Sequence, residues 1–449
     1  MFVILSNFFQ SFLEYNDRVI PGVNCFTTKV LLKFKNNALN LEILIIMGLA
    51  CGAGIIIFYF AMDDITIISY PGIFSNNLLS LGEEKSRYML AIGGRFRVVD
   101  FTVRNAFISE AKKMVIYNNF EDDLEDYLEN YGPYKSMSNS PIRVITREYS
   151  DVKFFHSLVM ESNTSYYIIY NGDNPSLIDF SKIVKKYIRN NTNALLLKIK
   201  LSDGHRATMA HTVLITSQKN LLRVLNDAID ESRYSPNIFE MIINVMINKG
   251  IMLDEFEAHY WPIKSVLDYY LFNMKVMKDE GVSSLIHNES QMMGYIKGEN
   301  SALIERGARV VNSFLSDSCI IYGTVVNSIL FPGVEIGERS VIEDSIILPF
   351  NKIGSGTRIV KTVLDERTKL NFDDEFPNIG NRCDIGTNDD FIKNRDFPKS
   401  LYRSITLIGK NCQILNDSNI GGACYVVSGG GRDYFSKSKY LDDGLSLFE

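Results

Sequence analysis

The stretch VVNSILFPGVEIGERSVIEDSIILPFNKIG, residues 325–354, places aliphatic side chains in a fixed rhythm. Aliphatic pairs six residues apart recur along and around it: Ile320 and Val326, Ile336 and Ile342, Ile353 and Ile359. Steps of 17 residues connect Ile329, Ile346 and Val363. Such spacing, in coils of about 18 residues, is typical of a parallel β-helix, whose coil sides each turn one aliphatic residue inward. The stretch therefore predicts a left-handed parallel β-helix.

The same rhythm sets the limits of this predicted domain. It runs over 303–371 and then stops, because residues 372–403 are polar and rich in turn-forming residues, which predicts an insertion. The spacing resumes at four positions: Ile408, Ile414, Ile420 and Val426. We therefore expect a further coil over 404–430, followed by a tail over 431–449.

Upstream of the β-helix, short apolar runs alternate with amphipathic segments. Six runs predict strands: 65–70, 114–117, 143–146, 166–170, 195–199 and 212–216. Three segments predict helices: 122–131, 179–190 and 217–229, the last with Ser217 as its N-cap. Continuous apolar strands separated by helices predict a mostly parallel sheet with helices on both faces. We expect this α/β domain over 63–285 and a linker over 286–302.

One predicted strand ends in residues suited to binding a metal ion. The run at 166–170 is followed by Asn171, Gly172 and Asp173. Ligands of such sheets bind beyond the carboxyl ends of the strands, and a carboxylate there can hold Mg²⁺. The alternative is an ordinary turn in which Asp173 caps the residues after it.

A second stretch, AIGGRFRVVDF at 91–101, combines bare backbone with fixed positive charge. Gly93 and Gly94 permit a tight turn, and Arg95 stands beside them. The stretch either binds an anion or forms a turn whose arginines pair with carboxylates such as Asp100.

Charge and cysteine content argue against several classes of protein. The net charge of −6 disfavours a nucleic-acid partner, because phosphate binding depends on clustered Lys and Arg. The six cysteines form no CxxC pair and are too sparse for a disulfide scaffold, so we expect reduced thiols and a cytoplasmic protein. The five histidines show no metal-ligand spacing.

The N-terminus carries a long apolar segment. Residues 43–62 are uncharged and long enough to cross a bilayer, with lysines before them and acids after. The predicted domain begins directly afterwards without a linker, so we interpret residues 1–62 as a hydrophobic leader outside the working fold. The alternative is a membrane attachment through 43–62, with the N-terminus in the cytoplasm.

Taken in order, the motifs resemble those of the ADP-glucose pyrophosphorylase (glucose-1-phosphate adenylyltransferase) family of glycogen synthesis. GGRFRVVDFTVRN at 93–105 is similar to the family's GGRYRLIDF signature, NGDN at 171–174 to its SGDH motif, and SVLDYYLFNM at 265–274 to the stretch before its linker. With the β-helix coils, the resemblance covers roughly 64–370. It implies a nucleotidyltransferase-like fold and, in active members, ATP, glucose 1-phosphate and Mg²⁺.

The chain departs from the family where the chemistry takes place. Active members have a GGxGTRL loop, whereas the matching stretch here, 69–87, lacks its glycine cluster. They hold Mg²⁺ between two aspartates; Asp173 matches the first, but Pro262 stands at the second position and cannot bind a metal through its side chain. The family's sugar-phosphate segment is reduced to LSDGHRATMA at 201–210, and His211 stands in place of a glycine.

These departures favour a noncatalytic or weakly catalytic, regulatory-type subunit, because each lost stabiliser of developing charge typically costs about 10²–10³ in rate. The resemblance implies assembly with an active paralogue or with itself, as a tetramer, and a sugar-phosphate effector. A degenerate nucleotide and sugar-phosphate pocket would then contain Gly93, Gly94, Arg95, Asp100 and Gly172.

Two other functions compete with this one. In an active nucleotidyltransferase, Arg95 would bind the nucleotide and Asp173 would bind Mg²⁺. An acyltransferase is the other common function of a β-helix, but such enzymes generally use a histidine on the coils, and all five histidines precede them. A structural or membrane-tethered scaffold is a further alternative.

Overall fold

The computed structural model describes residues 28–36, 39–47, 55–60, 65–72, 77–130, 142–146, 151–162, 164–189, 194–200, 212–230, 237–289, 300–368 and 377–448. The chain divides into two compact units, Met1–Asp63 and Asp64–Glu449. The segment 201–211 and part of the stretch 69–87, both compared with family motifs above, lie outside the described residues.

The first unit contains a three-stranded antiparallel sheet of β1 (Thr28–Asn36), β2 (Leu39–Met47) and β3 (Ile55–Phe60). The apolar segment 43–62, considered above as a membrane span, therefore contributes to two strands. No helix among the residues described here combines the length and apolar character that crossing a bilayer requires.

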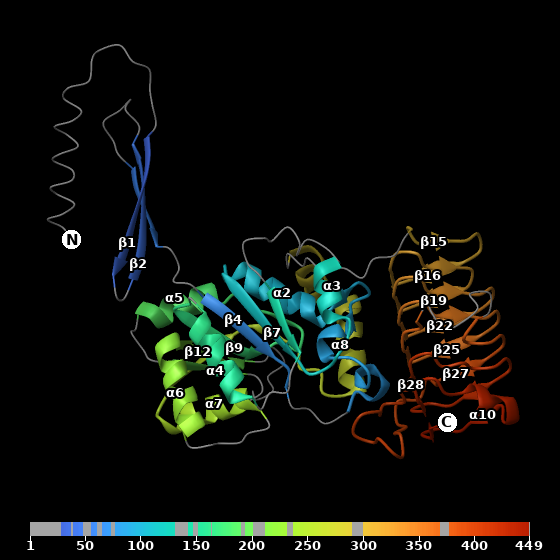
Figure 1. The fold of residues 1–449 in the computed structure, drawn as a ribbon. Coiled ribbons are helices and arrows are strands. Elements are labelled where there is room, and N and C mark those ends of the chain that lie inside the picture. The colour runs from blue at the N-terminus through green and yellow to red at the C-terminus, as the bar shows by residue number, and fades with distance from the viewer. Residues whose placement is uncertain are drawn as a thin grey trace, which may run out of the picture. The chain divides into compact units, whose positions relative to one another are not determined.

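The second unit begins with a seven-stranded sheet in the order β13-β11-β12-β9-β4-β7-β8 (Figure 1). Its strands are β4 (Ile65–Tyr70), β7 (Lys113–Asn118), β8 (Ile142–Thr146), β9 (Tyr166–Asn171), β11 (Ala194–Lys200), β12 (Thr212–Ser217) and β13 (Met252–Glu257). Only β12 runs antiparallel to its neighbours within this sheet. The predicted mostly parallel α/β sheet is confirmed.

Helices and short elements connect these strands. The α-helices are α2 (Val98–Ile108), α3 (Leu124–Asn130), α4 (Val152–Glu161), α5 (Ser181–Arg189), α6 (Gln218–Asp230), α7 (Ile238–Asn248), α8 (Val266–Lys278) and α9 (Glu280–Ser284). Shorter elements are the 3₁₀ turns η1 (Leu79–Gly82) and η2 (Arg87–Met89), the π-helical turn η5 (Leu285–Glu289), and the paired strands β5 (Ala91–Ile92) with β6 (Phe96–Arg97) and β10 (Ser176–Leu177) with β14 (His259–Tyr260). As predicted, Ser217 caps α6, because its Oγ accepts a hydrogen bond from the Asn220 amide at 3.3 Å.

Helices α4, α6 and α7 cover one face of the sheet. Phe155 of α4, Leu225 of α6 and Phe239 of α7 are buried against strand residues such as Ile68 and Val115. Burying side chains of this size contributes roughly 1.5–3 kcal/mol each. This core holds the strands in register, so it also fixes the sheet edge at which the strands end.

The C-terminal part is a β-helix of short parallel strands stacked in three sheets (Figure 1). One sheet contains β15 (Leu303–Ile304), β18 (Ile320–Ile321), β21 (Glu335–Ile336) and β24 (Lys352–Ile353). The second contains β16 (Arg309–Val311), β19 (Thr324–Val326), β22 (Val341–Glu343), β25 (Arg358–Val360), β27 (Asp384–Ile385), β29 (Asn419–Ile420) and β31 (Tyr440–Leu441). The third contains β17 (Phe314–Leu315), β20 (Ile329–Leu330), β23 (Ile346–Ile347), β26 (Thr362–Leu364), β28 (Thr406–Ile408), β30 (Tyr425–Val426) and β32 (Ser446–Leu447).

The 17-residue steps are confirmed, with one correction near the start. Ile329 pairs with Ile346, which pairs with Val363, and all three are fully buried. In the earlier coil, however, Ile321 and Val325 point inward, whereas the predicted Ile320 and Val326 are only half-buried. Ile321 reaches its partner Ile336 in 15 residues, so this coil is shorter and its inward positions shift.

The boundaries of the insertion and the tail also differ from the prediction. Ile379 bridges Ile353 and Ile414, and β27 pairs with β25 and β29, so residues 377–386 are part of a coil. A loop of 387–403 remains as the insertion. The expected tail contains helix α10 (Arg432–Lys437) and strands β31 and β32, which stack on the preceding coil.

The α/β part and the β-helix share a hydrophobic core. Leu267 and Tyr269 of α8 belong to the same buried cluster as Phe331, Leu348 and other coil residues. Polar contacts reinforce this packing, since the Tyr270 hydroxyl donates to the Asp344 carbonyl at 2.7 Å. The shared core makes these two parts one structural body.

Candidate functional site

The carboxyl edge of the sheet places Asp173 beside the end of β4. β9 pairs with β4 up to Tyr70 and Asn171, and the chain then turns through Gly172. A Cβ at Gly172 would lie 2.1 Å from the Ser69 Oγ, so glycine is required for this close approach. The turn brings the Asp173 carboxylate to the Gly72 amide, which donates to its Oδ2 at 2.9 Å.

Asp173 is completely buried, and protein donors surround its carboxylate. The Asn174 side chain donates to Oδ1 at 2.7 Å, and the Arg87 Nε lies 3.5 Å from Oδ2. Burial raises the pKa of Asp173, while the Arg87 guanidinium and the Gly72 amide oppose that rise. The carboxylate therefore depends on these neighbours to carry a charge inside the protein.

Arg87 also binds the chain segment that contains Pro262. Its Nη2 donates to the Asn174 Oδ1 at 2.9 Å, and the same guanidinium nitrogen donates to the carbonyl of Ile263. The Ile263 amide donates in turn to the Asn174 Oδ1 at 2.8 Å. The structure thus brings Asp173 and the Pro262 segment together, with an arginine between them.

This edge does not fit a resident magnesium ion. Mg²⁺ requires near-octahedral oxygen ligation and usually takes one or two carboxylates together with substrate phosphates. Here the single carboxylate already accepts from the Asn174 amide and faces Arg87, and Pro262 adds no side-chain oxygen. In the part of the chain that the structure describes, no three His, Cys, Asp or Glu side chains gather as metal ligands would.

The two adjacent glycines lie elsewhere, in the hairpin between β5 and β6. Both have positive φ, 60° at Gly93 and 85° at Gly94. The Gly93 amide donates to the Asn273 Oδ1 at 2.8 Å, and Gly94 packs so closely on Phe314 of the β-helix that a Cβ would lie 2.3 Å from that ring. The Arg95 guanidinium lies over the Phe96 ring, 5.2 Å from its centre. These residues shape a turn against α8 and the first coil, and they do not surround Asp173.

Asp100 has a local structural role. Its Oδ2 accepts from the Arg97 backbone amide at 2.7 Å, which closes the first turn of α2, and from the Tyr127 hydroxyl at 2.9 Å. Of the two arginines considered as its partners, Arg97 therefore contributes its backbone, while its guanidinium donates to the Met89 carbonyl. Of the predicted pocket residues, only Gly172 lies next to Asp173.

Sequence reasoning missed Arg87 and Asn174, which decide the character of this edge. Asn174 comes directly after Asp173, and its place in the NGDN motif was a usable signal. Arg87 is the last residue of the stretch that lacks the glycine cluster, but its partners lie about 90 and 180 residues downstream, a separation that no local pattern reveals.

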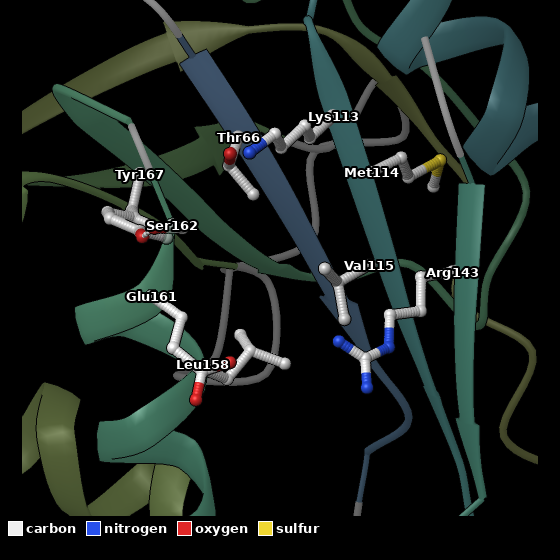
Figure 2. A pocket seen from close by; sticks show the side chains of 9 residues that line it. All are labelled: Thr66, Lys113, Met114, Val115, Arg143, Leu158, Glu161, Ser162 and Tyr167. Carbon is white, nitrogen blue, oxygen red and sulfur yellow. Dashed lines mark hydrogen bonds between the residues drawn. The ribbon is translucent and has the colours of Figure 1, made fainter.

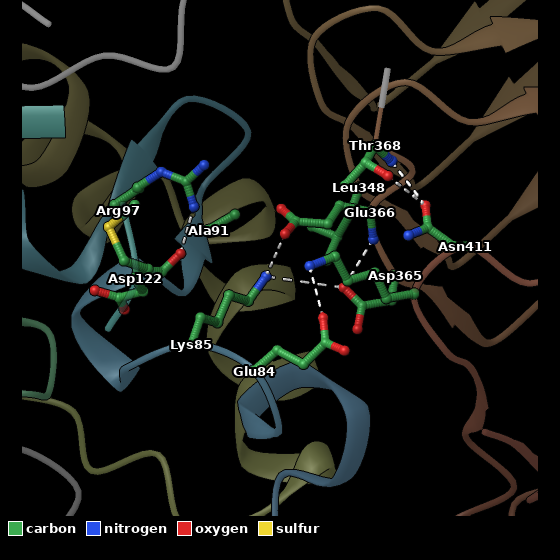
Figure 3. Close-up of polar contacts among 12 residues, drawn as sticks. Glu84, Lys85, Ala91, Arg97, Asp122, Leu348, Asp365, Glu366, Thr368 and Asn411 are labelled. Atoms are coloured by element: carbon green, nitrogen blue, oxygen red, sulfur yellow. Dashed lines mark hydrogen bonds and ion pairs between the residues drawn. The ribbon is translucent and has the colours of Figure 1, made fainter. Parts of the chain in front are cut away.

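A second charged cluster joins the segment after η1 to the β-helix (Figure 3). The Lys85 Nζ lies 3.0 Å from the Glu366 Oε1 and 4.0 Å from the Asp365 Oδ1, and all three groups are largely buried. Next to it, the Lys410 Nζ lies 3.0 Å from the Glu84 Oε2. These ion pairs hold residues 83–85 against the coils.

A pocket of about 260 Å³ lies near the amino ends of β4, β7 and β8, away from Asp173 (Figure 2). Lys113 and Arg143 extend into it from neighbouring strands, and Glu161 from the end of α4. The other lining residues are Thr66, Met114, Val115, Leu158, Ser162 and Tyr167. No residue of the predicted site lines this pocket.

The fold and its carboxyl edge define a class: a nucleotidyltransferase-like α/β domain followed by a hexapeptide β-helix. A family model described as "GlmU-like, C-terminal hexapeptide" matches residues 300–383. Glucose-1-phosphate adenylyltransferase of Thermosipho melanesiensis is 23% identical over 338 residues, 63% of this chain and 78% of the relative. The enzyme of the same name from Bacillus cytotoxicus is 21% identical over 331 residues, 64% of this chain and 88% of the relative. These matches confirm the resemblance that the motifs indicated, and the family of this chain is that of glucose-1-phosphate adenylyltransferase.

Proposed function

We propose that this chain is a noncatalytic or weakly catalytic, regulatory-type subunit of glucose-1-phosphate adenylyltransferase in glycogen synthesis. The observation that carries the proposal is the occupied carboxyl edge: the single carboxylate Asp173 is held by protein donors, and Pro262 stands opposite without a ligand atom. Transfer of a nucleotidyl group needs the charge of the triphosphate to be neutralised in place. An edge that cannot take Mg²⁺ loses that contribution, so Mg²⁺ is a cofactor only of an active partner.

The β-helix offers a surface for assembly with such a partner. Leu303, Ile304 and Val311 of the first coil are exposed, although residues of this kind are buried in the later coils. Apolar residues at the open end of a repeat stack are normally covered by a cap or a partner. This supports assembly with an active paralogue or with a second copy, as a tetramer, in which this chain changes the response to a sugar-phosphate effector.

The cysteines support a cytoplasmic location in this proposal. Cys319, Cys383, Cys412 and Cys424 are free and buried in the β-helix. Free thiols are typical of reducing compartments, where glycogen precursors are made.

The first test is ADP-glucose formation by the purified full chain with ATP, glucose 1-phosphate and Mg²⁺. We expect turnover several orders of magnitude below that of an active relative assayed in parallel. Comparable turnover would support the alternative of an active nucleotidyltransferase and would overturn the proposal.

The second test is co-expression with an active paralogue from the same genome. We expect the two chains to co-purify and the kinetics of the paralogue to change in the presence of a sugar phosphate. If the paralogue neither binds the chain nor changes its kinetics, the regulatory part of the proposal is wrong.

A further inference from the structure

Arg87 joins three segments that are distant in the sequence. It extends from η2 to the residues after β9 and to the segment before α8. Its side chain is only 12% exposed, and that of Asp173 is not exposed at all. The guanidinium is therefore part of the interior of this edge and is not a surface arginine that happens to lie near an acid.

The atoms that Arg87 contacts are all oxygens. They are the carboxylate Oδ2 of Asp173, the amide Oδ1 of Asn174 and the backbone carbonyl of Ile263. Carboxylate, amide and carbonyl oxygens are also the ligands that a hard divalent cation takes. A guanidinium can stand in for such a cation, because it keeps its charge at all physiological pH values and presents its N–H groups in a planar fork.

We propose that Arg87 is a built-in replacement for a divalent cation at the carboxyl edge of the sheet. It neutralises Asp173 and ties the Asn174 and Ile263 segments together, so the edge keeps its shape without a metal and has no room for one. This role rests on the proposed function only in taking this edge as the counterpart of the family's metal site.

Removal of the guanidinium should destabilise this edge and open it to a cation. Arg87→Ala leaves a buried carboxylate without its counter-charge, facing two further oxygens. Loss of one partner of a buried pair is strongly destabilising, and in a unit of this size it corresponds to a fall in Tm of roughly 5 °C. A divalent cation that enters the oxygen-lined space should restore part of that loss, because a ligand that binds the folded state alone stabilises it.

The experiment uses the full chain and Mn²⁺ as the probe. Binding is measured by the loss of the free Mn²⁺ signal in electron paramagnetic resonance, and stability by thermal unfolding with and without millimolar Mn²⁺. We expect no saturable site in the wild type, one new site in Arg87→Ala, and an Mn²⁺-dependent recovery of Tm in that variant. Arg309→Ala, which removes an exposed arginine of β16, controls for the change in net charge and should gain no site.

A second substitution ties the new site to this edge. In the Arg87→Ala, Asp173→Asn double variant, the Mn²⁺ site and the recovery of Tm should both disappear, while Arg87→Lys, which keeps a cation, should gain no site. A saturable Mn²⁺ site in the wild type that Asp173→Asn abolishes would overturn the inference. So would an Arg87→Ala variant that folds and shows no site, and so would a site that survives in the double variant.

If Arg87→Ala does not fold, the wild-type titration and Arg87→Lys still decide the question. The outcome is also separable from the proposed function. A wild-type chain that binds Mn²⁺ through Asp173 without forming ADP-glucose would overturn this inference and leave the proposed function standing.

Discussion

Replacing Glu366 with Gln tests whether buried charges hold residues 83–85 to the β-helix. Glu366 lies 3.0 Å from the Lys85 Nζ, with its side chain 17% exposed. Burial opposes the ionisation of Glu366, but Lys85, Arg97 and Lys410 outweigh burial and lower its pKa from 4.5 to about 2. A neutral amide of the same shape would leave the buried Lys85 without this partner, so we expect Glu366→Gln to lower the free energy of unfolding.

The shift in pKa sets the size and the pH dependence of the effect. A lowering from 4.5 to about 2 corresponds to roughly 3 kcal/mol, at about 1.4 kcal/mol per pKa unit. The folded-state pKa of Glu366 lies below its unfolded value. Its contribution is therefore complete above about pH 4.5 and is lost as the pH falls toward 2. The difference between wild type and Glu366→Gln should be largest at neutral pH and should close in acid.

Asp365 provides the matched control, because the two adjacent carboxyls respond in opposite directions. Burial raises the pKa of Asp365 against the attraction of Lys85, so its charge is unfavourable in the folded state above its ordinary pKa of 3.8. At pH 7 we therefore expect Asp365→Asn to be as stable as the wild type or more stable. Urea unfolding followed by circular dichroism, at pH 7 and in acid, measures both variants. Equal stability of wild type and Glu366→Gln at pH 7, or an Asp365→Asn as unstable as Glu366→Gln, would refute the reasoning.

Three further predictions concern packing and thiol chemistry. Gly94→Ala would place a Cβ 2.3 Å from the Phe314 ring at φ +85°, so it should cost about 1–3 kcal/mol more in urea unfolding than Gly250→Ala, where φ is +75° and no atom lies within 4 Å; equal losses would contradict this. Ile342→Ala empties a fully buried coil position and should cost about 2–5 kcal/mol, a loss that an unchanged urea midpoint would disprove. Burial raises the pKa of the Cys412 thiol to about 12, so iodoacetamide at pH 8 should alkylate it only after unfolding; modification of the native protein, seen by mass spectrometry, would show that the thiol is accessible.

The β-helix could be predicted because each coil repeats the same short-range pattern. The errors arose where the pattern was locally ambiguous. Ile320 and Ile321 are adjacent, and only the length of the coil decides which of them points inward. Ile379 and Ile385 are six residues apart within the supposed insertion, but the polar stretch before them concealed that the rhythm continues.

The candidate site was harder to predict, because its character depends on contacts between distant residues. Asp173 comes directly after a recognisable strand, so local sequence was enough to place it at the sheet edge. The two glycines also formed the expected turn, but the surface that this turn meets includes Phe314, 220 residues downstream. Arg87 carries no motif, and its importance becomes visible only once Asp173 and Ile263 are placed beside it.

The core shared by α8 and the coils has a consequence for synthesis on the ribosome. The cluster that buries Tyr270 is completed only by Leu407 and Tyr425, which are translated about 155 residues later. At about 5–20 residues per second, the apolar face of α8 waits roughly 8–30 s for its cover. During that interval the nascent chain presents a sticky surface to its neighbours, so chaperone supply, more than the intrinsic speed of coil formation, should govern the yield of folded protein in the cell.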